Sequence, residues 1–267
     1  IAGDAGGAVT EGDPDDVIST TGLLTSSDVD DASTATWSGG GTQTYGSLSV
    51  DQTGLWTYAL DSAAADSLEE GVTVTETYTV TVTDDHSGSD SQVVTIDITG
   101  TNDDPVLSVE ATGSVTEDAS ATDLTDSGTL SFTDVDTTDT HTVSVSDNVD
   151  ASWTGGTLSA AQITALTGGF SADSDSWDYT VANADTQFLA DGETVTFSYD
   201  VTVTDDSSTG TATDTEKVTI TINGTNDAPE LSVADTGSVT EDASATDLTS
   251  SGALSFTDVD TTDGHTV

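Results

Sequence analysis

The strongest constraint on the fold is that this chain repeats itself. Several segments recur with one common spacing, and the copies are residues 115–125 with 239–249, 132–139 with 256–263, and 100–103 with 224–227. The first pair is identical letter for letter, and the offset is 124 positions in each case (239 − 115). A looser copy stands 106 positions upstream, at Thr10–Glu11 and Leu24–Asp30. A fixed long period indicates a tandem array, which favours a spacer or binding rod over an enzyme.

The repeats set the expected domain limits. They predict one repeat over residues 1–103, a second over 104–227 and the first strands of a third over 228–267. The second repeat carries an insertion near 146–172, with a possible short helix near Leu158–Leu166, either for a specific contact or, as is commoner, as a tolerated surface insertion. We expect the chain to be a piece of a longer array, so that missing export signals carry no weight.

The charge balance excludes several classes of partner. The chain has 50 acidic residues and one base, Lys217, so nucleic acid is excluded and an anionic membrane surface is disfavoured. The missing counter-charge must come from divalent metal or from salt around a halophilic surface, and acids at repeated positions favour metal. The chain also lacks cysteine, and calcium can replace the disulfides of small extracellular domains. No apolar segment is long enough to predict membrane insertion.

Alternating threonine and valine predict an all-β fold. In Tyr78–Thr83 and its copy Tyr199–Thr204, apolar side chains face one side and mostly threonine the other, as in a half-buried antiparallel strand. Other strands are expected at 35–37, 47–50, 55–60, 94–98, 128–132, 177–181 and 218–222. About seven short strands per repeat, separated by turn signals, are typical of a β-sandwich.

The aromatic residues have two interpretations. The four tryptophans are Trp37, Trp56, Trp153 and Trp177. They would form either a sugar-stacking platform or core, and for Trp56 and Trp177 the alternating strands favour core. Tyr78 and Tyr199 are predicted to form a tyrosine corner or simply to pack in the core.

Further motifs give the chain a family resemblance. They are Thr-Val-Thr-Asp-Asp at 81–85 and 202–206, Gly-Thr-Asn-Asp-x-Pro at 100–105 and 224–229, Thr-Glu-Asp at 116–118 and Leu-Ser-Phe-Thr-Asp-Val-Asp at 130–136. With these motifs the chain resembles the VCBS repeat of giant bacterial surface proteins, a cadherin-like and immunoglobulin-like module. The resemblance implies tandem Greek-key β-sandwiches arranged end to end, in the extender region of an RTX-type adhesin or biofilm protein. It also implies type I secretion, a bacterial cell-surface location and no enzyme activity.

A sandwich topology predicts where calcium would bind. If the first strand runs down, the A–B turn with Glu11 lies at the bottom, and the B–C and F–G loops lie at the top. The linker after the last strand then brings bottom acids of one repeat to top acids of the next. Calcium takes six to eight oxygen ligands. The first junction would offer Glu11, Asn102, Asp103, Asp104, Asp134, Asp136 and Asp205, with Glu70 as a further ligand.

The same scheme extends to the other ends of the repeats. The second junction would use Glu117, Asp191, Asn226, Asp227, Asp258 and Asp260, and the top of the first repeat would use Asp28, Asp30 and Asp84. The alternative is that Asp, Asn and Gly are ordinary turn formers. The junction departs from cadherins in placing Gly100 and Gly224 where an Asp often stands. His86, His141 and His265 lack a second histidine at ligand spacing, so a surface or strand-end position is favoured over zinc.

These observations leave three functional hypotheses. The first is a non-catalytic extender, a calcium-rigidified rod that projects an adhesive region for surface attachment or biofilm formation. The second is that a repeat surface itself binds carbohydrate or another cell. The third is the stalk of a secreted hydrolase. The expected partners are adjacent repeats of the same chain, and cell-surface or matrix components through regions outside this sequence.

Overall fold

The computed structural model describes residues 1–12, 15–29, 34–117, 121–207, 212–233, 236–241, 243–244 and 246–266. Its elements in chain order are β1 (Ala2–Gly3), β2 (Gly6–Thr10), β3 (Ser19–Thr25), β4 (Ala35–Gly39), β5 (Gly41–Thr42), β6 (Gly46–Val50), β7 (Leu55–Leu60), α1 (Ser62–Ala65), β8 (Thr73–Asp84), β9 (Ser89–Thr99), β10 (Val106–Val109), β11 (Thr112–Thr116), β12 (Asp123–Thr133), β13 (Thr142–Asp147), β14 (Ser152–Trp153), α2 (Ala160–Thr167), β15 (Phe170–Ala172), β16 (Ser176–Ala182), η1 (Asn183–Asp185), β17 (Thr194–Thr204), β18 (Thr213–Asn223), β19 (Glu230–Val233) and β20 (Leu254–Thr257). None of the described helices has the length and apolar character needed to cross a bilayer.

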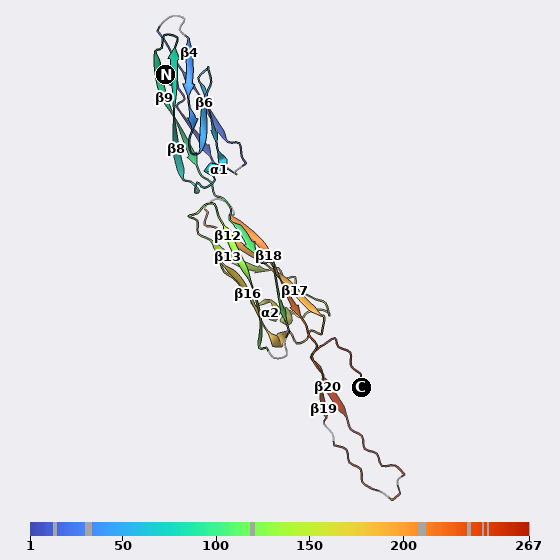
Figure 1. Cartoon of the computed structure of the whole chain (residues 1–267). Coiled ribbons are helices and arrows are strands. Elements are labelled where there is room, and N and C mark those ends of the chain that lie inside the picture. The colour runs from blue at the N-terminus through green and yellow to red at the C-terminus, as the bar shows by residue number, and fades with distance from the viewer. Residues whose placement is uncertain are drawn as a thin grey trace. The chain divides into compact units, whose positions relative to one another are not determined.

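The first repeat is a sandwich of two sheets (Figure 1), with strand orders β1-β3-β7-β6-β5 and β2-β9-β8-β4. The first strand is divided, because β1 pairs with β3 in one sheet while β2 runs parallel to β9 in the other. In the lettering of such sandwiches, β1 and β2 form strand A, and strands B to G are β3, β4, β6, β7, β8 and β9. The expected seven-strand plan is therefore confirmed.

The second repeat follows the same plan. Its sheets have strand orders β10-β12-β16-β15 and β11-β18-β17-β13, with β14 also paired to β17. Strand A is again divided, since β11 runs parallel to β18. A separate antiparallel pair, β19 and β20, repeats the positions of β10 and the end of β12. The fold is thus all-β with tandem immunoglobulin-like and cadherin-like sandwiches, as predicted.

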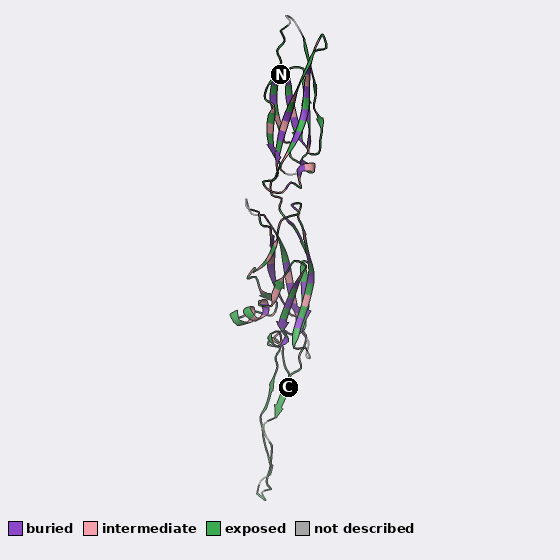
Figure 2. Ribbon diagram, turned by 90° about the vertical axis from the view of Figure 1, so that its left-hand side faces the viewer, coloured by how far each residue is buried: buried purple, intermediate pink, exposed green. Residues whose placement is uncertain are grey.

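Buried residues alternate with exposed ones along the strands (Figure 2). Trp56 and Trp177 are 0% exposed, and each indole Nε1 donates a hydrogen bond to a backbone oxygen, of Asp4 at 2.8 Å and of Glu110 at 2.9 Å. A Cβ at Gly128 would lie 2.4 Å from the Trp177 ring, so only glycine fits there. Because the indoles fill the interior, the core interpretation is confirmed for these two tryptophans.

The tyrosines of the first repeat surround a buried acid. The hydroxyls of Tyr58 and Tyr78 donate to Glu76 Oε2 at 3.1 Å and 2.7 Å, and Tyr45 N–H donates to Oε1 at 2.7 Å. Burial, together with the Glu76 carboxylate, raises the pKa of both hydroxyls. The Tyr78 hydroxyl oxygen also lies 3.1 Å from the backbone oxygen of Gly46, 32 positions away, so Tyr78 is a core residue and not a local corner.

The insertion of the second repeat completes that repeat's core. Helix α2 begins with a capping box between Ser159 and Gln162, as expected for a helix here. Its last turn accepts two buried hydroxyls, because Tyr179 donates to Leu166 O at 2.7 Å and Tyr199 donates to Thr167 O at 2.6 Å. Leu166 is fully buried. The predicted helix is confirmed, but the interpretation as a tolerated surface insertion is wrong, because the helix supplies the acceptors that Glu76 supplies in the first repeat.

The chain divides into two compact units. The first unit comprises Ile1–Val106 together with Thr133–His141 and Thr204–Asp214, and the second comprises Leu107–Phe132, Thr142–Val203 and Thr215–Val267. The B–C and F–G loops of the second repeat therefore belong to the first unit. The domain limits at 103 and 227 stay predictions.

Candidate metal centre

The first unit gathers acidic side chains from five parts of the chain. We call this set the first acidic centre, and its members are Glu11, Asp66, Glu69, Glu70, Asn102, Asp103, Asp134, Asp136, Asp139 and Asp205. Two groups are close enough to share an ion, with one oxygen from each residue inside 4.8 Å of the others. They are Glu11 with Asp66 and Asp103, and Asp134 with Asp139 and Asp205.

Backbone hydrogen bonds fix the carboxylates. Thr101 N–H donates to Glu11 Oε2 at 2.9 Å, and Asp103 N–H donates to Asp136 Oδ2 at 2.9 Å. Asp136 N–H donates in turn to Asp134 Oδ1 at 3.0 Å. The loops are thus held by main-chain donors, as is common where aspartate organises a turn, and each carboxylate keeps a second oxygen for other partners.

The remaining oxygens lack protein donors. Six buried oxygen atoms of this centre have no hydrogen-bond partner among the described residues, namely Glu11 Oε1, Asp66 Oδ1, Glu69 Oε2, Asn102 Oδ1, Asp103 Oδ2 and Asp136 Oδ1. Glu11 is 5% exposed and Asp136 is 0% exposed. Buried polar atoms are nearly always paired, so an unpaired group of this size requires an external partner.

The electrostatics require a positive partner. Burial, and after it the charges of Asp66 and Glu11, raise the pKa of Asp103 to about 7. Burial also raises the pKa of Glu11 and of Asp136, and neighbouring carboxylates add to both shifts. The chain has one lysine and no arginine to neutralise them. A set of hard oxygens without thiolate ligands suits calcium, which takes six to eight oxygens, so the residues fit this ion.

Most of the predicted first-junction residues come together. Glu11, Asn102, Asp103, Asp134, Asp136 and Asp205 all lie in the centre, and Asn102 Nδ2 donates to Asp205 Oδ2 at 3.2 Å. Glu70 Oε2 accepts a hydrogen bond from Ser207 Oγ at 3.1 Å, which places it beside the same loop. Asp104 is exposed and lies in neither close group.

Three members of the centre were not predicted from the sequence. Asp66 follows α1, Glu69 accepts a hydrogen bond from Thr138 N–H at 3.2 Å, and Asp139 lies in the close group with Asp134. Asp66 and Glu69 have no acidic copy in the second repeat, so a search for recurring acids could not find them. Asp139 does recur, as Asp263, and that recurrence was a usable signal.

Gly100 explains the departure from the cadherin linker. A Cβ at this position would lie 1.9 Å from the backbone oxygen of Leu68 and 2.5 Å from that of Glu69. Gly100 N–H donates to Val72 O at 2.9 Å, which keeps this approach close. An aspartate there would therefore displace the turn that carries Glu69 and Glu70.

The second unit holds a related set, the second acidic centre, with Glu117, Asn226, Asp227, Asp258 and Asp260. Its scaffold repeats the first, because Asp227 N–H donates to Asp260 Oδ2 at 2.8 Å and Thr225 N–H donates to Glu117 Oε2 at 3.2 Å. Asp227 Oδ2 and Asp260 Oδ1 have no partner among the described residues. Asp191, predicted as a ligand, is exposed, and Glu193 contacts the third-repeat loop instead, accepting from Thr262 Oγ1 at 2.6 Å.

Two of the three histidines contact these loops. His141 Nε2 lies 2.7 Å from Asp134 Oδ2, and His265 Nε2 lies 2.7 Å from Asp258 Oδ2. Each imidazole therefore occupies one oxygen of the first aspartate in the Asp-x-Asp pair. This fits the strand-end position expected from the sequence, and Asp136 Oδ1 and Asp260 Oδ1 remain without a partner among the described residues.

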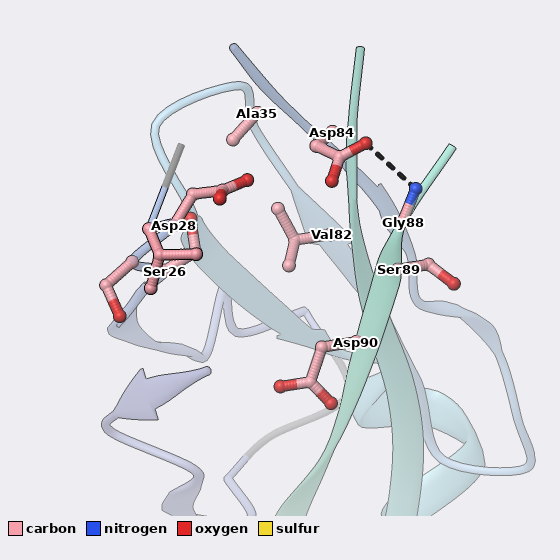
Figure 3. Close-up of a pocket in the computed structure, with 10 residues that line it drawn as sticks. Ser26, Asp28, Ala35, Val82, Asp84, Gly88, Ser89 and Asp90 are labelled. Atoms are coloured by element: carbon pink, nitrogen blue, oxygen red, sulfur yellow. Dashed lines mark hydrogen bonds between the residues drawn. The ribbon is translucent and has the colours of Figure 1, made fainter. Parts of the chain in front are cut away.

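The predicted acids at the far end of the first repeat line an open pocket. Asp28, Asp84 and Asp90 line this pocket (Figure 3), and Asp30 lies outside the described residues. Asp84 Oδ1 accepts from His86 N–H at 2.7 Å and Gly88 N–H at 2.8 Å. Asp84 also groups with Asp85 and His86, but both neighbours are exposed, so the turn-forming role accounts for its geometry.

A comparison with protein families finds a match for the first repeat. Residues 1–100 match the family model of the bacterial cadherin-like domain. The first repeat is therefore similar to bacterial cadherin-like domains. A sequence comparison with curated proteins finds no match.

Similar solved structures include several cadherin fragments. Repeats EC22-24 of mouse cadherin-23 share 13% identity over 96% of this chain and 75% of that chain, with a TM-score of 0.46. Protocadherin gammaB7 EC3-6 shares 16% identity over 85% of this chain and 48% of that chain, with a TM-score of 0.43. Human mucin-like protocadherin EC1-2 shares 12% identity, with coverages of 83% and 95% and a TM-score of 0.37.

Proposed function

We propose that this chain is a non-catalytic extender region of a secreted bacterial surface adhesin, in which calcium fixes each repeat to the next. The observation that carries the proposal is the group of six buried oxygens without hydrogen-bond donors among the described residues of the first acidic centre. These oxygens come from the body of the first repeat, from the linker and from a loop of the second repeat.

Calcium would act as a conditional link. Without it the carboxylates of the centre repel one another, and with it the B–C loop of the second repeat is tied to the base of the first. Glu11, Asp66 and Asp103 would hold the ion, with Asp134, Asp136 and Asp205 as further members of the same centre. Chain bending at the linker would then cost ligand bonds, so successive repeats would transmit force to an adhesive region elsewhere in the protein.

The same charge suits export. A net charge of −49 without disulfides opposes collapse where calcium is scarce, as in a bacterial cytosol, and would leave the chain threadable through a type I secretion channel. Calcium outside the cell would then fill the centres and order the repeats. A calcium-independent variant that folds before export is expected to stall in the channel.

The tryptophans give little support to a sugar-binding surface, since the half-buried Trp153 packs against the core of the second repeat. Trp56 and Trp177 are buried and unavailable for sugar stacking, and Trp37 is 5% exposed. The paired carboxylates lie in loops that carry backbone hydrogen bonds. In a chain with 50 acids, two carboxylates that lie close together are no evidence for glycoside hydrolysis.

Small-angle scattering tests the proposed link. The maximum dimension of the chain is expected to increase when calcium is added to chelator-treated protein at constant ionic strength. Replacing Asp134 and Asp136 by asparagine should abolish the increase, whereas Asp178→Asn, which removes a charge from an exposed strand position, should preserve it. An identical calcium response in the double variant and in wild type would contradict the role of these two aspartates.

A further inference from the structure

The two acidic centres share a scaffold but differ in one pocket. We call the group Glu11, Asp66 and Asp103 the first glutamate pocket, and Glu117, Gln187 and Asp227 the second. The correspondence of Asp66 with Gln187 follows from an offset of 121 (187 − 66), which also relates Leu68 to Leu189 and Gly71 to Gly192. Gly71 and Gly192 both have positive φ, 73° and 81°, so the two turns match in conformation.

In both pockets one glutamate oxygen accepts a hydrogen bond from the backbone N–H of an equivalent threonine. Glu11 Oε2 accepts from Thr101 N–H at 2.9 Å, and Glu117 Oε2 accepts from Thr225 N–H at 3.2 Å. Both glutamates are almost fully buried, at 5% and 3% exposed. The two pockets therefore agree in the burial of the glutamate and in the partner of its Oε2 atom.

The second oxygen distinguishes them. Glu11 Oε1 has no hydrogen-bond partner among the described residues, and neither do Asp66 Oδ1 and Asp103 Oδ2. Glu117 Oε1, by contrast, accepts a hydrogen bond from the Gln187 side-chain amide. The amide N–H therefore satisfies the oxygen that corresponds to the unpartnered Glu11 Oε1.

A second acid is replaced in the same way. Glu69 Oε2 is buried and unpartnered among the described residues, whereas the corresponding position in the second repeat is Ala190. Nearby, Glu193 Oε2 accepts from Trp153 Nε1 at 3.1 Å and from Ala190 N–H at 3.2 Å. Glu117 and Glu193 of the second repeat thus accept hydrogen bonds from protein donors, whereas Glu11 and Glu69 each keep one oxygen without a partner among the described residues.

We infer that the first glutamate pocket binds a divalent cation, and that Gln187 closes the second pocket so that a hydrogen bond stands in place of that ion. The inference rests on the proposed calcium function and adds that the centres are unequal. The Asp227–Asp260 oxygens keep an open position in the second centre, so this centre would bind fewer ions rather than none. The two junctions of this chain would then differ in how firmly calcium links them.

Exchange of the two residues tests the inference. Isothermal titration of the chelator-treated 267-residue chain with calcium chloride gives the number of bound ions for wild type and for Asp66→Gln, Gln187→Asp and the double exchange. Asp66→Gln should lose one ion or weaken one site at least tenfold, Gln187→Asp should gain one ion, and the double exchange should return to the wild-type number. Asp178→Asn is the matched charge control and should leave the number unchanged.

The outcomes distinguish a failure of this inference from a failure of the proposed calcium function. Unchanged calcium number and affinity in both single variants would overturn the inference while leaving calcium binding intact. Absence of calcium uptake by wild type would refute the proposed function itself. Near-ultraviolet circular dichroism of the buried Trp56 and Trp177 verifies folding, and if Asp66→Gln fails to fold, the gain or absence of an ion in Gln187→Asp decides.

Discussion

Calcium removal is expected to destabilise the first repeat strongly. In the first glutamate pocket, one oxygen each of Glu11, Asp66 and Asp103 lies within 4.8 Å of the others. At that distance two unit charges repel by about 0.9 kcal/mol in water and by about 3.5 kcal/mol at an effective dielectric constant near 20. Three such pairs amount to about 2.6 to 10 kcal/mol if all three groups stay ionised, which is comparable to the stability of a whole domain.

Calcium should reverse this repulsion and add binding free energy. An ion that binds only the folded state contributes about 2.7 kcal/mol per site at a hundredfold excess over Kd. Because 1 kcal/mol moves the Tm of a domain of up to 100 residues by roughly 4–8 °C, a single filled site should raise the Tm by more than about 10 °C. The gain is expected in the unfolding transition of the first repeat, whose core contains Trp56.

Differential scanning calorimetry in EDTA and in millimolar calcium measures this gain. Sodium chloride is added to the EDTA sample so that both samples have equal ionic strength. Equal melting temperatures would refute the argument from the unpaired oxygens. An equal gain from monovalent salt alone would instead favour a halophilic surface, because screening does not depend on ligand geometry.

Three further predictions follow from individual residues. In EDTA, Tm should fall as the pH rises from about 4 to 7, because the pKa of Asp103 and of Glu117 is raised to about 7 in the folded chain and their stabilising protonation is lost over this range. A Tm that rises over this range would contradict those shifts. Calcium should remove the pH dependence. Glu76→Gln should cost about 1.5–3 kcal/mol in urea unfolding, because a buried carboxylate that accepts two tyrosine hydroxyls becomes an amide; an unchanged urea midpoint would count against that network. Gly100→Ala should lower the Tm and weaken calcium binding, whereas Gly264→Ala, where nothing lies within 4 Å of the new Cβ, should do neither; equal effects of the two changes would show that crowding at Gly100 is unimportant.

Local patterns in the sequence determined the architecture. Alternation in Tyr78–Thr83 and Tyr199–Thr204 predicted strands whose buried faces are those seen, because side chains on a strand alternate regardless of what covers them. The two tryptophans were assignable to the core for the same reason. Recurring acids also marked the loops that form the two centres, since a turn is specified by its own few residues.

Tertiary structure alone decided which partner each polar side chain meets. Asp66 joins Glu11 from a distant loop, and Gln187 contacts Glu117 across 70 positions of sequence. Glu76 is an ordinary strand residue by pattern, and only the sandwich interior places it between two tyrosine hydroxyls. Helix α2 likewise becomes part of the core through its carbonyl groups. These contacts depend on the register and spacing of separate strands, which no local pattern of residues encodes, whereas strand formation itself depends mainly on neighbours along the chain.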